Sequence, residues 1–287
     1  MKKSQSTKTR PTSRRTAARL ALLLAVSLLL SLAGAGCSWT GGNVSNYEDD
    51  EDIIVPAGTY TKLIVENHAG TIRIRGGDGE NVRGILRKKA SGNGASILKS
   101  VVAAATYQIV AEGETLRIKE VFKTDDRVDF WNWKETNHPD VNVGLEYDLV
   151  VPAGIQSIEI YQSAGNTELT GVTGNVSIVN NAGNITMTGV SLSGDSRIAL
   201  VSGNLDLSLA ALDPAASLIA ELTAGNVSLR LPKNTDASLG VEVAAGTISG
   251  NIDSLPVTNS AVTHTLGAGS ALISIRVTSG NISVKAD

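Results

Sequence analysis

A short turn recurs along this sequence and constrains its fold more than any other feature. Segments such as "VSIVNNAGNITMTG" and "LIAELTAGNVSLRL" hold two strand-like stretches around a small residue, a glycine and an asparagine. Four successive spacings between the turn glycines are 18, 20, 22 and 21 residues, which is the range of stacked repeat units. The turn glycines are Gly70, Gly165, Gly183, Gly203, Gly225, Gly246 and Gly280.

Apolar and polar residues alternate after each turn, with the period of a β-strand. Ile185 and Met187, for example, alternate with Thr186 and Thr188, so one face points inward and the other outward. A coil of about 20 residues cannot bury its inward row alone, whereas stacked coils can. We therefore predict an all-β, single-domain β-solenoid, similar to a parallel β-helix, built from stacked two-strand coils.

The N-terminus has the pattern of an export signal. A basic leader ends at Arg19, and the apolar run that follows is too short to span a bilayer comfortably. "LAGAGC" then resembles a bacterial lipobox, with Gly34 where leucine is usual. The resemblance implies cleavage after Gly36 and lipidation of Cys37, the only cysteine. The alternative is ordinary secretion with cleavage after Ala35.

These features divide the chain into three parts. Residues 1–36 are the predicted signal peptide, and residues 37–52 are the lipidated cysteine with a flexible acidic tether. Residues 53–287 form the predicted solenoid, in which the repeat breaks between 77 and 150. That divergent insertion or cap is expected to contain a small helix near Ala95–Ala104, strands at 107–111 and 115–121, and a polar loop over 123–140.

Three aromatic residues in that loop, Phe130, Trp131 and Trp133, are the best candidates for ligand or partner contact. The alternative is that they pack on the open first coil and cap the solenoid, which repeat folds require. Both interpretations stay open on the sequence alone.

The rest of the sequence limits the classes of function. Seven basic and no acidic residues lie in the first 36 positions, so the remainder carries a net charge of −10 and is a poor partner for nucleic acid. His68, His138 and His264 are far apart, and no metal or cofactor is expected.

We predict a non-enzymatic protein. The alternative, a carbohydrate-active β-helix enzyme such as a polysaccharide lyase or hydrolase, needs a carboxylate pair or a basic catalyst on one outward face. The outward positions instead hold mostly Ser, Thr and Asn, with scattered charges at Asp206, Glu221, Arg230 and Glu242.

Two longer segments, "IIVPAGTYTKLIVENHAGTIRIRG" and "YDLVVPAGIQSIEIYQSAGNTELTG", resemble the DUF4097 family of adhesin-like bacterial β-solenoid proteins. The resemblance covers about residues 53–287 and implies no catalytic residues. It implies an exported or membrane-attached protein, and together with the lipobox it predicts a lipoprotein anchored on the cell surface or in the periplasm. Such a protein would serve as an adhesin-like or scaffold module for an envelope component or protein partner, with a link to envelope stress sensing in some members.

Overall fold

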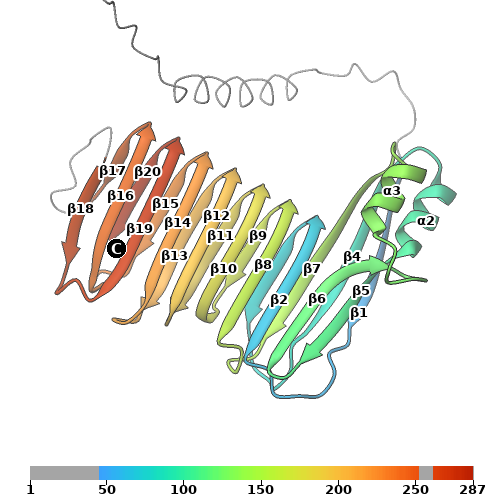
Figure 1. Cartoon of the computed structure of the whole chain (residues 1–287), viewed down its shortest axis with the longest axis horizontal. Coiled ribbons are helices and arrows are strands. Elements are labelled where there is room, and N and C mark those ends of the chain that lie inside the picture. Colours follow the sequence, from blue (N-terminus) through green and yellow to red (C-terminus); the bar gives the residue numbers. More distant parts are fainter. Residues whose placement is uncertain (1–44, 252–260, 287) are drawn as a thin grey trace, which may run out of the picture. The chain divides into compact units, whose positions relative to one another are not determined.

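Each coil of the chain contributes one strand to each of two faces, which we name face A and face B (Figure 1). The computed structural model describes residues 45–251 and 261–286, so the predicted signal peptide and Cys37 lie outside the described residues. The strands of face A, in spatial order, are β1 (Ser45–Ile53), β4 (Arg83–Gly92), β7 (Asn142–Val151), β3 (Ile72–Gly76), β9 (Thr167–Thr170), β11 (Ile185–Leu192), β13 (Leu205–Leu212), β15 (Val227–Leu231), β20 (Ile282–Ala286) and β17 (Ile248–Gly250).

Face B lies across the core from face A and supplies the second strand of each coil. Its strands, in spatial order, are β5 (Ala105–Glu112), β6 (Thr115–Phe122), β2 (Lys62–Ala69), β8 (Ser157–Ala164), β10 (Thr173–Ala182), β12 (Asp195–Ser202), β14 (Ser217–Ala224), β19 (Ala271–Ser279), β16 (Ala237–Ala245) and β18 (Ala261–Leu266). The start of β10 also pairs with β11, which joins the two faces into one mixed sheet. The β-solenoid predicted from the repeats is confirmed.

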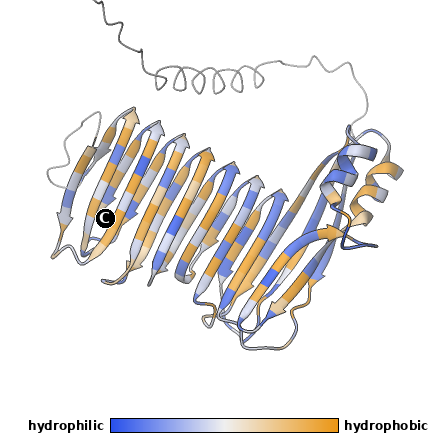
Figure 2. Cartoon of the chain, in the orientation of Figure 1, coloured by the Kyte–Doolittle hydropathy of each residue, from blue (hydrophilic) through white to orange (hydrophobic). Residues whose placement is uncertain are grey.

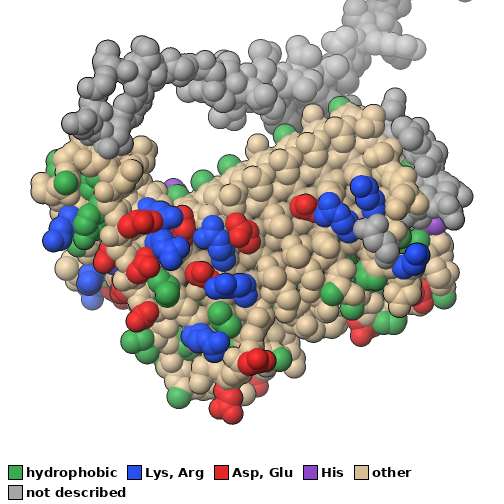
Figure 3. Space-filling model, turned by 180° about the vertical axis from the view of Figure 1, so that it is seen from behind, with side chains coloured by type: hydrophobic (Ala, Val, Ile, Leu, Met, Phe, Trp, Pro, Cys, Tyr) green, Lys and Arg blue, Asp and Glu red, His purple; other side chains and the backbone are tan. Residues whose placement is uncertain are grey.

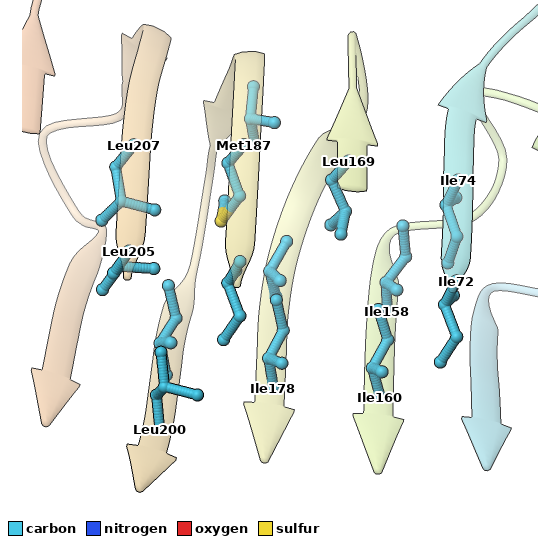
Figure 4. Packing of buried hydrophobic residues seen from close by; sticks show 14 of the residues in the cluster. Ile72, Ile74, Ile158, Ile160, Leu169, Ile178, Met187, Leu200, Leu205 and Leu207 are labelled. Carbon is cyan, nitrogen blue, oxygen red and sulfur yellow. The ribbon is translucent and has the colours of Figure 1, made fainter. Parts of the chain in front are cut away.

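The core lies between the two faces and consists of aliphatic side chains in layers. Ile160 and Ile178 of face B point toward Leu169 and Met187 of face A, and all four are buried (Figure 4). Apolar and polar positions alternate along the strands, as the hydropathy colours show (Figure 2). The predicted alternation after the turns is therefore confirmed. Each fully buried aliphatic side chain contributes about 1.5–3 kcal/mol to folding.

The stacking order of the coils differs from their order in the chain. The coils β8–β9, β10–β11, β12–β13 and β14–β15 follow one another, but the last coil, β19–β20, lies between β14–β15 and β16–β17. Its register is continuous on both sides, since Arg276 pairs with Glu221 of β14 and with Glu242 of β16. The final segment of the chain thus fills an interior position of the stack.

The divergent segment, together with β1, builds the end of the stack that lies away from β16 and β17. Strands β6 and β7 extend the parallel stack beyond β2 and β3. Strands β4 and β1 then continue face A in antiparallel pairing, and β5 continues face B, so β1 and β5 are the edges. Between β4 and β5, helix α2 (Ala95–Ala104) buries Leu98, Val101 and Val102 against this end. The helix occupies the predicted residues. A second helix, α3 (Phe130–Asn137), replaces part of the predicted loop.

The acidic segment before the domain is a strand rather than the predicted flexible tether. Its residues Ser45–Ile53 form β1, which pairs with β4 so that Asp49 lies opposite Lys88 and Glu48 opposite Lys89. The Nζ atom of the buried Lys88 side chain lies 2.8 Å from Asp49 and 3.0 Å from Glu51. Repulsion between the acidic side chains therefore does not keep this segment extended in solvent, because basic side chains on the neighbouring strand β4 neutralise them. Charged side chains also crowd this end of the molecule in Figure 3.

Candidate functional site

The predicted contact residues lie on a helix. Helix α3 begins after Asp129, whose side chain accepts a hydrogen bond of 2.6 Å from the backbone N–H of Asn132. This is an N-cap, which satisfies one of the free N–H groups of the first turn. The expectation of a polar loop over 123–140 was therefore wrong for residues 130–137. The capping aspartate three residues before Asn132 is the signal that identifies this helix start.

The three aromatic side chains of α3 pack largely inward. Phe130 is only 1% exposed and belongs to the core. Trp133 makes edge contacts with Phe122 and His138, at centroid distances of 4.9 and 5.2 Å. Trp131 is half-buried against the same core. Phe130 is thus an anchor for the helix, and the other two rings have partly accessible surfaces.

Trp131 and His68 form a stacked pair above a buried carboxylate. Their ring centroids lie 4.7 Å apart, with an angle of 27° between the planes. The indole Nε1–H of Trp131 donates to Glu120 Oε1 at 3.1 Å, and the backbone N–H of His68 donates to the same oxygen at 2.5 Å. Glu120 therefore connects three elements, because it lies on β6 and receives hydrogen bonds from α3 and β2.

Burial has the largest effect on the pKa of the Glu120 carboxyl group. Removal from water raises the pKa of its carboxyl from the ordinary 4.5 to about 6, although the hydrogen bonds from His68 and Trp131 act in the opposite direction. Its second oxygen, Oε2, is buried without a hydrogen-bond partner in the described structure, as are Asn67 Oδ1 and Tyr147 Oη. Since one oxygen is buried and the other accepts two bonds, this carboxyl group is not presented to a substrate in the way a general acid requires.

An open groove runs along face B just before the turns, and we name it the corner groove. It is lined by two parallel rows of outward side chains, the second row lying two residues after the first. The first row consists of Glu66, Tyr161, Val179, Ala199, Glu221 and Arg276, which the strand register places side by side. The second row consists of His68, Ser163, Asn181, Val201, Thr223 and Thr278.

The corner groove exposes apolar side chains in its middle and carries paired charges at its ends. Tyr161, Val179 and Val201 are 44%, 40% and 51% exposed. Glu221 pairs with Arg197 at 2.6 Å, and Arg276 pairs with Glu242 at 3.2 Å. Glu66 is in turn paired with Arg117. This groove was not predicted from the sequence, although "IEIYQSAG", "VSIVNNAG" and "RIALVSG" each carry an apolar residue at an outward position.

The scattered charges considered for catalysis are also paired across neighbouring strands. Asp206 lies 3.1 Å from Arg230, and Glu221 and Glu242 bind the arginines named above. Within the described ranges, no group of three or more His, Cys, Asp or Glu side chains is arranged to hold a metal ion. Neither described helix has the length and apolar character to cross a bilayer.

The predicted turn glycines lie on top of one another at the corner beside the groove. In spatial order they are Gly70, Gly165, Gly183, Gly203, Gly225, Gly280 and Gly246. The residues that follow these glycines also stack on one another. The backbone N–H and Nδ2 of Asn204 donate to Asn184 Oδ1 at 3.0 and 3.2 Å, and Asn226 donates to Asn204 in the same way. This asparagine ladder continues through Asn281 to Thr247.

The fold is a β-solenoid, and its described residues form an open surface groove without a cluster of metal ligands. The sequence profile of the Toastrack DUF4097 family matches residues 33–285, and the chain belongs to this family. No curated protein matches the chain.

Several solved structures are similar to the chain at low identity. A candidate cell adhesion protein from Clostridium sporogenes is 14% identical, with a TM-score of 0.40 over 85% of this chain and 100% of its own. A candidate adhesin from Bacteroides fragilis is 13% identical, with a TM-score of 0.39 over 83% and 97%. A candidate lipid binding protein from Parabacteroides distasonis is 14% identical, with a TM-score of 0.24 over 83% and 96%.

Proposed function

We propose that this chain is a non-enzymatic, adhesin-like interaction module of the bacterial cell envelope, exported and held at the membrane by a lipid on Cys37. The corner groove is the observation that carries the proposal. Its middle exposes three apolar side chains, Tyr161, Val179 and Val201, in neighbouring coils of face B. Exposed apolar positions of this kind, rimmed by polar residues, are typical of interaction sites.

The stack itself suits a scaffold or adhesive role. Every coil pairs with its neighbours through backbone hydrogen bonds, and the turns are tied by the asparagine ladder. A surface built this way presents its side chains at fixed spacing along the solenoid axis, which lowers the entropic cost of binding an extended partner. A role in envelope stress sensing would use the same surface with a protein partner.

An adhesion assay tests the proposal. Beads coated with the purified full-length protein should be retained on intact bacterial cells more than albumin-coated beads. The double variant Tyr161→Ala/Val201→Ser should reduce this retention, because it removes the exposed apolar surface. Leu272→Ala is the matched control, since Leu272 is also exposed on face B but does not line the groove. Retention no greater than that of albumin beads would refute the proposed function.

A further inference from the structure

The corner groove is long enough for a linear polymer. Its lining residues come from seven adjacent strands of face B, in the order β6, β2, β8, β10, β12, β14 and β19 (Figure 1). Neighbouring strands lie about 4.8 Å apart, so the groove extends over roughly 29 Å along the solenoid axis. Its two parts share Val179 and Asn181, so they adjoin one another on face B.

The two rows of the groove offer complementary chemistry. The first row presents the ring of Tyr161, whose hydroxyl is held by Glu159 at 3.3 Å, followed by Val179 and Ala199. The second row presents hydroxyl and amide groups at most coils, from Ser163 and Asn181 through Thr223 and Thr278. His68, which stacks on Trp131, lines the end of the groove nearest β6.

Most charges in the groove are balanced within the protein, and the exception is Glu120 at the β6 end, which accepts hydrogen bonds from His68 and Trp131 but has no cationic partner among the described residues. Glu66, Glu221 and Arg276 each have an oppositely charged partner on an adjacent strand. The middle of the groove, between Tyr161 and Val201, holds no charged side chain in its two rows. A strongly anionic or cationic polymer would therefore find no complementary field there.

We infer that the corner groove binds a neutral, linear polysaccharide along the solenoid axis. Sugar rings have apolar faces that pack on aromatic and aliphatic side chains, and hydroxyl groups at their edges that bond to Ser, Thr and Asn. Both kinds of group recur in the groove at the strand spacing. The inference rests on the proposed interaction function and gives that function the chemical class of its ligand.

Calorimetry and affinity electrophoresis with the full-length protein test the inference. The probes are cellohexaose, chitohexaose, a linear mannan and a linear β-1,3-glucan, with alginate as an anionic polymer and a casein digest as a peptide source. We expect binding to at least one neutral glycan. Tyr161→Ala should weaken it about tenfold or more, as loss of an aromatic anchor does, while Leu272→Ala should bind like the wild type.

The outcomes separate this inference from the proposed function. Binding of alginate or peptides that is lost in Tyr161→Ala, without neutral glycan binding, would overturn the polysaccharide class and keep the interaction function. Glycan binding that is unchanged in Tyr161→Ala would overturn the groove as its site. Failure of every probe, together with coated beads that still adhere to cells, would also overturn the inference alone.

Discussion

At the residue scale, the turn glycines are required by the close approach of neighbouring coils. Gly203 has a φ of +143°, and a Cβ atom there would lie 1.6 Å from the carbonyl oxygen of Gly183. We expect Gly203→Ala to lower the free energy of unfolding by more than about 3 kcal/mol, because backbone strain and a steric clash add. Urea denaturation measures the effect.

A matched glycine separates the two causes. Gly189 also has a positive φ, of +64°, but a Cβ atom at this position meets nothing within 4 Å. Gly189→Ala should therefore cost only about 1–2 kcal/mol, the conformational term alone. Equal losses in the two variants would show that stacking distance does not select glycine at these turns.

The buried carboxyl of Glu120 makes stability depend on pH. Its pKa is raised from 4.5 to about 6 by burial, so the folded state binds the proton more tightly than the unfolded chain. This contribution is most favourable below about pH 4.5 and is lost as the pH rises through 6, with a total of roughly 2 kcal/mol. Urea denaturation between pH 4 and 7.5 should show it as a difference between wild type and Glu120→Gln, in which this titration is absent. Parallel stability profiles would contradict the assignment.

At the scale of elements, helix α3 has the contacts expected of a cap. Trp133 packs on Phe122 and Trp131 is tied to Glu120, so both rings hold the helix to the end of the stack. We expect Trp131→Ala/Trp133→Ala to lower the melting temperature clearly, since each half-buried ring contributes about 2–3 kcal/mol. Thermal denaturation measures this, and adhesion measured below the melting point of the variant should persist. An unchanged melting temperature with lost adhesion would instead make α3 the contact site.

Local patterns predicted the strands and turns well because each signal lies within a few residues. The stacking position of "LISIRVTSGNISVK" was not predictable, since its glycine and asparagine fit beside any other coil. The edge strand β1 was missed because its partner, the basic run Arg87–Lys89, lies about 40 residues away. The corner groove was missed for a related reason: Tyr161, Val179 and Val201 become neighbours only when coils stack.

At the scale of the whole molecule, the proposed anchor is testable by its mass. The mature protein should begin at Cys37 and carry acyl chains on the sulfur and the new amino terminus, which together hold it stably at a membrane. Mass spectrometry of the N-terminal peptide from the native host measures this. An unmodified chain that begins at Gly36 would show secretion by the ordinary route, and Cys37→Ser should move the protein from the membrane fraction to the soluble fraction.

Adhesion of living cells in a flow chamber tests the central claim most directly, because it requires both the anchor and the groove. Cells that display the wild-type chain, with surface amounts matched by antibody labelling, should resist detachment from a surface of the native envelope polysaccharide. Cells that display Tyr161→Ala/Val201→Ser should detach at lower flow, whereas cells with Leu272→Ala should behave like the wild type. Equal detachment of all three, at the level of cells that lack the chain, would contradict an adhesin-like role for this solenoid.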